Sequence, residues 1–235
     1  MPPGGVSLAV GGLVPLSSGD WPGRLSAVVF LQGCPWSCGY CHNPHLIPAG
    51  DGEPDGWQRL LGLLRRRRGL LDAVVFSGGE PTLQDALPAA MDTVRALGFA
   101  VGLHTSGAYP ERLRGILPLA DWVGMDAKAP FDDYARACGA PGSGAKARES
   151  ARLLVESGVP CEFRTTVHPR VHSTGSLLSL AADLRALGAR RWVLQEFRAT
   201  GCADEDFARS PSWLPEPALR ECLAGMFESF TVRSA

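Results

Sequence analysis

Three cysteines crowd into one short stretch of this chain, in the run Leu31-Gln-Gly-Cys34-Pro-Trp-Ser-Cys38-Gly-Tyr-Cys41. Their spacing, C-x3-C-x2-C, places three thiolates on a single loop directly after an apolar, strand-like segment. Thiolates are the usual ligands of iron–sulfur clusters, and a 4Fe-4S cube normally takes four of them. Three thiolates leave one iron without a protein ligand. An open coordination position is more typical of a catalytic metal site than of a structural one.

A structural zinc site is the alternative interpretation of the same loop. Zinc in such sites takes four ligands in a closed shell, and His42 or His45 could supply the fourth. The other cysteines do not suggest a second cluster, because they are scattered without paired spacing, at Cys138, Cys161, Cys202 and Cys222. An odd total of seven cysteines in a chain of this length argues against a disulfide framework.

The composition excludes several classes of protein. The formal net charge is -1 and 45% of the residues are hydrophobic, so no overall charge favours nucleic acid or an anionic membrane. No apolar run approaches the ~20 residues of a membrane span. The opening residues lack the basic and apolar pattern of a secretory signal. We therefore expect a cytoplasmic protein with no nucleic acid and no membrane among its partners.

Short apolar segments alternate with amphipathic helical patterns along the chain. Apolar residues recur at i, i+3, i+4 and i+7 from Trp57, from Leu87 and from Leu177, which predicts helices there. The strand-like segments are Ala27–Leu31, Ala73–Phe76, Ala100–Leu103, Trp122–Met125, Cys161–Val167 and Trp192–Phe197. This alternation predicts an α/β fold of βαβ units with a parallel sheet.

Six such units fit the chain. A closed eightfold barrel needs ~250 residues for its units alone, so we predict an incomplete (βα)6 TIM-type barrel. The boundaries predicted for a single domain, 1–235, are an N-terminal extension at 1–24, a barrel core at 25–200 and a tail with a helix at 201–235. The extension is expected to add a strand or hairpin beside the barrel.

Polar motifs follow five of the six predicted strands. The C-terminal ends of parallel strands form the mouth of a barrel, where active sites are built. Polar residues gathered there are hard to explain as packing. The motifs are Ser77-Gly-Gly-Glu80, His104-Thr-Ser-Gly107, Asp126-Ala-Lys128, Arg164-Thr-Thr-Val-His168 and Gln195-Glu-Phe-Arg198.

The cysteine loop followed by Gly-Gly-Glu after the next strand resembles the radical SAM superfamily. The resemblance implies that Cys34, Cys38 and Cys41 hold a 4Fe-4S cluster, whose open iron is filled by the amino and carboxylate groups of S-adenosylmethionine. The reduced cluster would then cleave that cofactor to methionine and a 5′-deoxyadenosyl radical. Tyr40 would lie near the adenine, and His42 and Thr105 would also belong to the cofactor site.

The loop formed by Ser77, Gly78, Gly79 and Glu80 would hold the methionine moiety of the cofactor. Glycines let a backbone approach a ligand closely, and a carboxylate accepts hydrogen bonds from an amino group. The alternative is a plain strand-to-helix turn with Pro81 at the first helical position.

The Asp126-x-Lys128 pair resembles that of the glycyl radical enzyme activases. There the lysine lies near the cofactor carboxylate and the aspartate helps to bind a monovalent cation. The alternative is an ion pair at the end of a strand. His104 departs from the activase motif Asp-Thr-Asn-Gly, and a neutral imidazole is a poor ligand for a hard cation. The monovalent cation is therefore doubtful in this chain.

Four segments spread along the chain carry a narrower resemblance. Together they resemble the activating protein of anaerobic ribonucleoside-triphosphate reductase. This resemblance implies a glycyl radical enzyme as partner, from whose glycine the radical takes a hydrogen, and an electron donor such as flavodoxin or ferredoxin. Arg164 and His168 would contact cofactor carboxylate or ribose, or be ordinary rim residues. The matching segments are Trp21-Pro-Gly, Cys41-His-Asn-Pro, Glu162-Phe-Arg-Thr-Thr-Val and Gln195-Glu-Phe-Arg.

Three other functions stay open. One is a small-molecule radical SAM enzyme such as 7-carboxy-7-deazaguanine synthase. The second is a metal-binding module without catalysis, and the third is an electron-transfer iron–sulfur protein. The histidines at 168 and 172 have the spacing of a metal pair, but Pro169 makes a regular helix there unfavourable. The run Arg65–Arg68 suits the C-terminal end of a helix.

Overall fold

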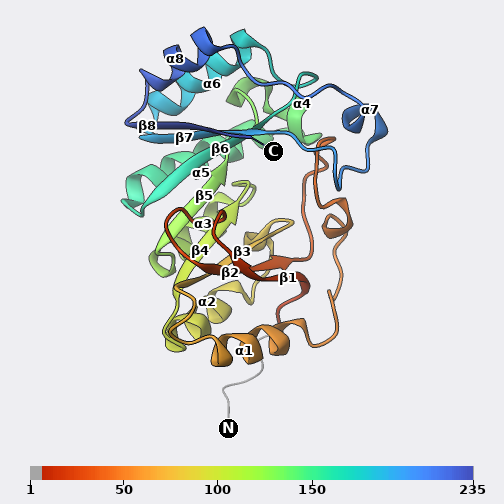
Figure 1. Cartoon of the computed structure of the whole chain (residues 1–235), viewed down its shortest axis with the longest axis vertical. Coiled ribbons are helices and arrows are strands. Elements are labelled where there is room, and N and C mark those ends of the chain that lie inside the picture. Colours follow the sequence, from red (N-terminus) through yellow and green to blue (C-terminus); the bar gives the residue numbers. More distant parts are fainter. Residues whose placement is uncertain (1–6, 235) are drawn as a thin grey trace. The chain divides into compact units, whose positions relative to one another are not determined.

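A computed structural model describes residues 7–234 (Figure 1). Within that range the strands follow one another in sequence order in an eight-stranded sheet. The first two strands are antiparallel, whereas β2, β3 and β4 are parallel, as are β6, β7 and β8. The strands are β1 Val10–Ser17, β2 Ser26–Leu31, β3 Ala73–Gly78, β4 Ala100–Thr105, β5 Trp122–Asp126, β6 Cys161–Val167, β7 Arg191–Glu196 and β8 Ser229–Arg233.

Helices connect most of these strands. The α-helices are α1 Gly56–Arg66, α2 Leu87–Ala96, α3 Pro110–Ile116, α4 Tyr134–Cys138, α5 Ser143–Ser157, α6 Thr174–Ala186, α7 Glu205–Ala208 and α8 Pro217–Ala224. Short 3-10 helices cover Pro44–Leu46, Pro81–Leu83, Leu117–Leu119 and Phe131–Asp133. Over residues 7–234, no helix has the length and apolar character needed to cross a membrane.

The predicted α/β class, with a mostly parallel sheet that is not closed, is confirmed. All six predicted strands are present, and β1 is the strand expected within the N-terminal extension. Residues 201–234 contain α7 and α8, and also β8, which was not predicted. That strand is short and alternates polar with apolar residues. Its Phe230 lies against Trp192 of β7, with ring centroids 5.7 Å apart, a long-range contact with no local sequence signal.

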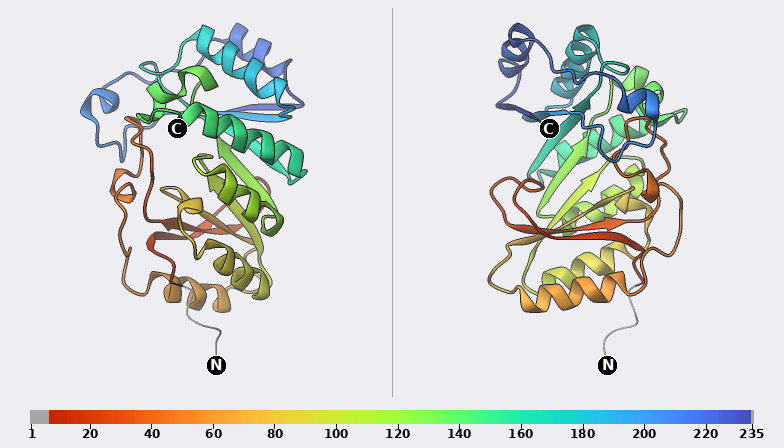
Figure 2. Two further views of the ribbon diagram at one scale, coloured as in Figure 1. Left: turned by 180° about the vertical axis from the view of Figure 1, so that it is seen from behind. Right: turned by 45° about the vertical axis from the view of Figure 1, so that its right-hand side comes forward.

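The described residues form two compact units. The first comprises residues 7–35, 45–105 and 111–124, and the second comprises residues 36–44, 106–110 and 125–234. In the first unit α1 packs against β1 and α2 against β4, and in the second α8 packs against β8 and α6. Figure 2 shows α1 and α2 together on one side of their strands. Each unit thus has helices covering strands, as parallel sheets require.

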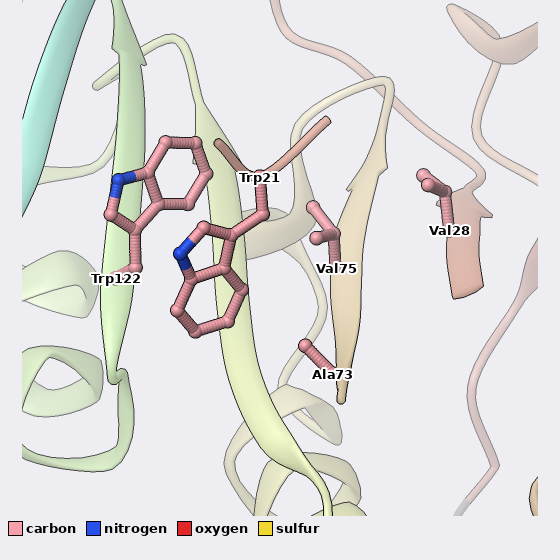
Figure 3. Close-up of a cluster of buried hydrophobic side chains, with 5 residues drawn as sticks. All are labelled: Trp21, Val28, Ala73, Val75 and Trp122. Atoms are coloured by element: carbon pink, nitrogen blue, oxygen red, sulfur yellow. The ribbon is translucent and has the colours of Figure 1, made fainter. Parts of the chain in front are cut away.

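Two tryptophans lie at the centre of a buried cluster in the first unit (Figure 3). Trp21 and Trp122 stack with ring centroids 5.5 Å apart, beside Val28 and Val75. Gly102 makes room for this stack, because a Cβ there would come within 2.9 Å of the Trp21 ring. The Trp21 segment is thereby fixed next to β4, and β4 ends in the polar His104–Gly107 motif.

The three predicted apolar stripes are the buried faces of α1, α2 and α6. In α6, Ser173 and Ser176 form a capping box, in which each side chain bonds the other's backbone N–H. Such caps satisfy backbone donors that the first helical turn leaves open. The buried stripe determines which face of each helix packs on the sheet. This packing also helps to fix the polar residues at the C-terminal end of the preceding strand.

Candidate functional site

The cysteine loop begins where β2 ends. The backbone N–H of Cys34 donates to the Ile47 carbonyl at 3.0 Å, and that of Cys41 donates to the Cys38 carbonyl at 3.1 Å. All three thiols are partly exposed and none is in a disulfide. Cys34 belongs to the first unit, and Cys38 and Cys41 belong to the second. The loop therefore carries three cysteines outside any disulfide, and thiolates are the ligands that an iron–sulfur cluster needs.

No three His, Cys, Asp or Glu side chains within residues 7–234 are already grouped closely enough to hold a metal ion. The chemistry of the donors nevertheless fits an iron–sulfur cluster, because thiolates are its ligands and none of the three cysteines is in a disulfide. The assignment of Cys34, Cys38 and Cys41 as ligands stays a prediction.

A distant segment packs on the second part of the loop. The Cys202 thiol donates to the Gly39 carbonyl at 3.3 Å, and a Cβ on Gly39 would meet the Phe207 ring at 2.3 Å. The Tyr40 ring lies 6.2 Å from that of Phe207. Gly201 approaches the His42 carbonyl so closely that a Cβ there would sit 2.4 Å from it. Residues 201–207 thus hold the loop, which no local sequence pattern could have indicated.

Two polar atoms on this loop are buried without a hydrogen-bond partner in the described part of the chain, the Tyr40 hydroxyl and Nε2 of His42. Burial raises the pKa of Tyr40 well above its usual value. Burial also lowers the pKa of His42, which a main-chain hydrogen bond to Arg198 only partly offsets. Buried polar atoms are normally satisfied, so the pair points to a bound group with polar atoms of its own. This favours a cofactor-binding role for both residues.

The Gly-Gly-Glu loop lies against the residues just before Cys34. The N–H of Gly79 donates to the Leu31 carbonyl at 2.9 Å, and that of Glu80 donates to the Gly33 carbonyl at 2.8 Å. Gly78 adopts a φ of 113°, which side chains rarely tolerate. A Cβ on Gly79 would stand 2.2 Å from the Gly33 oxygen. These glycines are therefore needed for the approach of one backbone to another, which fixes the root of the cysteine loop.

Replacing Gly79 by alanine is expected to lower the free energy of unfolding by about 1–3 kcal/mol, because the backbone at Gly33 has to move. Gly115→Ala is the matched control, since a Cβ there meets nothing within 4 Å and alanine favours a helix. Urea denaturation of both variants measures the difference. Equal stability of the two would contradict the close approach at Gly79.

Glu80 is fully buried at the end of this loop. Its Oε1 accepts from the Thr82 N–H at 3.1 Å, the Thr82 hydroxyl at 2.6 Å and the Thr105 hydroxyl at 2.8 Å. It also caps the short helix Pro81–Leu83, with Pro81 at its start. The alternative of a strand-to-helix turn is thus realised, and Thr105 contacts Glu80. A buried carboxylate with so many donors is nonetheless a preformed acceptor site for an amino group.

His104 joins three parts of the first unit. Its Nε2 lies 2.9 Å from the Asp20 carbonyl, which can only accept, so Nε2–H is the donor. Its Nδ1 lies 3.2 Å from the hydroxyl of Ser77. The ring also packs edge-on against Trp122, at 5.6 Å. Where the activase motif has an aspartate, this chain therefore has an imidazole that binds the main chain and Ser77, a donor set unsuited to a hard cation.

Asp126 is paired with two cations in the second unit. Its Oδ2 lies 3.0 Å from Nζ of Lys128 and its Oδ1 lies 3.1 Å from Nη2 of Arg164. Burial by itself would lower the pKa of Lys128, but the Asp126 carboxylate foremost, with Cys38 and Tyr40 as further contributors, raises that pKa well above its usual value. Lys128 is therefore a partly buried, charged ammonium, 6.0 Å from the Tyr40 ring centroid. The ion pair predicted at the end of the strand is present, and two cationic side chains share the single Asp126 carboxylate.

His168 is fully buried next to the same segment that holds the cysteine loop. Its Nε2 lies 3.2 Å from the Phe207 carbonyl, and its Nδ1 accepts from the Arg170 N–H at 3.1 Å. Burial lowers its pKa. Both ring nitrogens thus contact the main chain. The predicted contact of His168 with a cofactor stays a prediction, and its geometry favours a role in holding residue 207 in place.

Comparison of the sequence with known proteins agrees with the geometry of the site. Residues 28–172 match the sequence model of the Radical SAM superfamily. The chain is 30% identical over 222 residues to the "Putative glycyl-radical enzyme activating enzyme" of Methanocaldococcus jannaschii, covering 86% of this chain and 85% of that protein. It is also 30% identical over 157 residues to the 7-carboxy-7-deazaguanine synthase of Thermococcus kodakarensis, covering 58% of this chain and 61% of the relative.

Among solved structures, QueE from Escherichia coli shares the fold, with a TM-score of 0.54 at 20% identity over 91% of this chain and 96% of that one. A family match over more than half of the chain and a similarity spanning nearly all of it agree with the three-cysteine loop, the Gly-Gly-Glu turn and the open α/β sheet. The chain belongs to the radical SAM superfamily.

Proposed function

We propose that this protein is a glycyl radical enzyme activase. The observation that carries the proposal is the extent of its similarity to the "Putative glycyl-radical enzyme activating enzyme" of Methanocaldococcus jannaschii, which covers most of both chains. The similarity to the deazaguanine synthase covers a smaller share of each. The Asp126–Lys128 pair, which resembles that of the activases, supports the same choice because its ion pair is formed in the second unit, with both side chains partly buried.

Cys34, Cys38 and Cys41 would hold a 4Fe-4S cluster, and S-adenosylmethionine would bind at its open iron. When bound, these groups supply one-electron cleavage of a carbon–sulfur bond and a radical that abstracts hydrogen. The chain's own residues would bind and orient. Glu80 would accept from the cofactor amino group, and Lys128 would attract its carboxylate. Tyr40 and His42 would offer their unpartnered polar atoms to the bound group.

The partner would be a glycyl radical enzyme, with anaerobic ribonucleotide reductase as the first candidate. Support comes from the Trp21-Pro-Gly segment, which the stack of Trp21 on Trp122 fixes in the first unit, and from the segments of β6 and β7 that carry the narrower resemblance. Electrons would come from a flavodoxin or ferredoxin. Seven cysteines, none of them in a disulfide, suit a reducing compartment, so we propose the cytosol.

The test is anaerobic reconstitution with iron and sulfide, followed by reduction with S-adenosylmethionine and the candidate reductase. The expected results are 5′-deoxyadenosine and an EPR doublet from a glycyl radical on the reductase. Formation of 5′-deoxyadenosine without a doublet on any glycyl radical enzyme of the same genome would reject the activase and favour a small-molecule enzyme such as 7-carboxy-7-deazaguanine synthase. Zinc uptake without any cleavage would reject both.

A further inference from the structure

Two buried histidines lie four residues apart, His168 and His172, and the second has no role in the proposed function. They lie before α6, on either side of a turn over residues 169–171. The backbone N–H of His172 closes this turn by donating to the His168 carbonyl at 2.8 Å. The return contact uses the side chain, because the His168 N–H donates to Nδ1 of His172 at 3.1 Å. His172 is only 3% exposed. This reciprocal pair fixes the orientation of the His172 ring.

The other nitrogen of that ring reaches the chain beside Asp126. Nε2 of His172 lies 2.9 Å from the Lys128 carbonyl. A carbonyl only accepts and Nδ1 already accepts, so the ring is neutral with its hydrogen on Nε2. Burial lowers the pKa of His172 to about 4, which agrees with a single neutral tautomer at physiological pH.

The main chain on both sides of Lys128 is thereby held. Its N–H donates to the Tyr134 hydroxyl at 3.1 Å, and that hydroxyl donates to the Asp126 carbonyl at 3.0 Å. His172 holds the carbonyl side. A lysine side chain has four rotatable bonds and loses much entropy when it is fixed. Anchoring its backbone at both ends limits where the ammonium can go, next to Asp126 and the Tyr40 ring.

We propose that His172 is a positioning residue for Lys128, and that it aims the lysine ammonium at the carboxylate of an amino-acid-type cofactor. This inference rests on the proposed function, because the carboxylate would be that of S-adenosylmethionine. His172 itself touches no cofactor in this scheme; it acts through the Lys128 carbonyl.

Two variants separate the contacts of the ring. In His172→Asn the amide oxygen can still accept from the His168 N–H, but the side chain is too short to reach Lys128. In His172→Gln the amide nitrogen stands near the place of Nε2 and can donate to the Lys128 carbonyl. We expect the dissociation constant for S-adenosylmethionine, measured on the anaerobically reconstituted protein, to rise about tenfold in H172N, roughly 1.4 kcal/mol, and less than threefold in H172Q.

A double-mutant cycle with Lys128→Met distinguishes positioning from general loosening. If His172 acts through Lys128, H172N adds nothing to the affinity loss of K128M, whereas independent effects add. Hydrogen exchange without any cofactor gives a second readout, with faster exchange expected at amides 127–129 in H172N but not in H172Q.

Unchanged exchange and affinity in H172N, or full additivity with K128M, would overturn the inference. A wild-type protein that binds no S-adenosylmethionine would instead overturn the proposed function, while the exchange data would still report whether His172 holds Lys128.

Discussion

Replacing any one of Cys34, Cys38 or Cys41 by alanine is expected to abolish reductive cleavage of S-adenosylmethionine. Each variant should lose most of the roughly four irons per chain that a full cluster would contribute. The cleavage activity should fall by more than the 10–100-fold that is typical when a residue supporting a metal ligand is replaced, because each of these cysteines would bind iron itself. Iron and sulfide content and the yield of 5′-deoxyadenosine, all measured anaerobically after reconstitution, test this.

Cys161→Ala is the matched control for these variants. Cys161 begins β6, and burial raises the pKa of its thiol to about 11. It therefore stays protonated near neutral pH, and a protonated thiol is a poor metal ligand. C161A should keep the iron content and activity of the wild type. Full iron content in Cys34→Ala, or its loss in C161A, would show that the ligand set has been wrongly assigned.

Local sequence patterns were sufficient to predict most of the fold. Continuous apolar runs such as that of β2 predict strands buried in a parallel sheet, and the stripe from Trp57 predicts the buried face of α1. The continuous run reports that both faces of β2 are buried, and the period of the stripe reports which face of α1 is buried. β8 carries only a short alternation of polar and apolar residues. What holds it is its pairing with β7 and the contact of Phe230 with Trp192, which is far away in the sequence.

The residues of the candidate site could be predicted from the sequence, but the residues that hold them in place could not. The motif residues could be read because parallel strands deliver their C-terminal ends to one edge. Phe207, Cys202, Tyr134 and His172 were not foreseen as parts of the site. Their contacts with the cysteine loop or with the Asp126–Lys128 turn join segments separated by up to 163 residues or act through main-chain carbonyls. A carbonyl has no sequence signature, so such supports can be found only in the structure.

Glu80→Ala and Glu80→Gln are expected to separate the two roles of this buried carboxylate, as a structural cap and as a cofactor ligand. In E80A three donors lose their acceptor: the Thr82 N–H, the Thr82 hydroxyl and the Thr105 hydroxyl. At about 1–3 kcal/mol for each buried donor left unsatisfied, the free energy of unfolding should fall by roughly 3–9 kcal/mol. Denaturant titration measures it.

Glutamine keeps an oxygen where Oε1 stands, so E80Q can still accept these bonds, and we expect it to fold with a loss of only about 1 kcal/mol. It lacks the negative charge, however, and charge-assisted hydrogen bonds are about twice as strong as neutral ones. If Glu80 accepts from the cofactor amino group, the dissociation constant for S-adenosylmethionine should rise at least about tenfold in E80Q.

Glu111→Gln removes the same charge at an exposed position of the first unit, where the side chain is 80% accessible, and should leave both stability and affinity unchanged. Equal cofactor affinity in E80Q and in the wild type would reduce Glu80 to a helix cap. A loss of affinity in E80Q with stability near that of E111Q would show instead that the buried carboxylate is needed for its charge. That result would tie the Gly-Gly-Glu turn to cofactor binding independently of any effect on folding, because the hydrogen bonds that hold the turn are the ones that glutamine preserves.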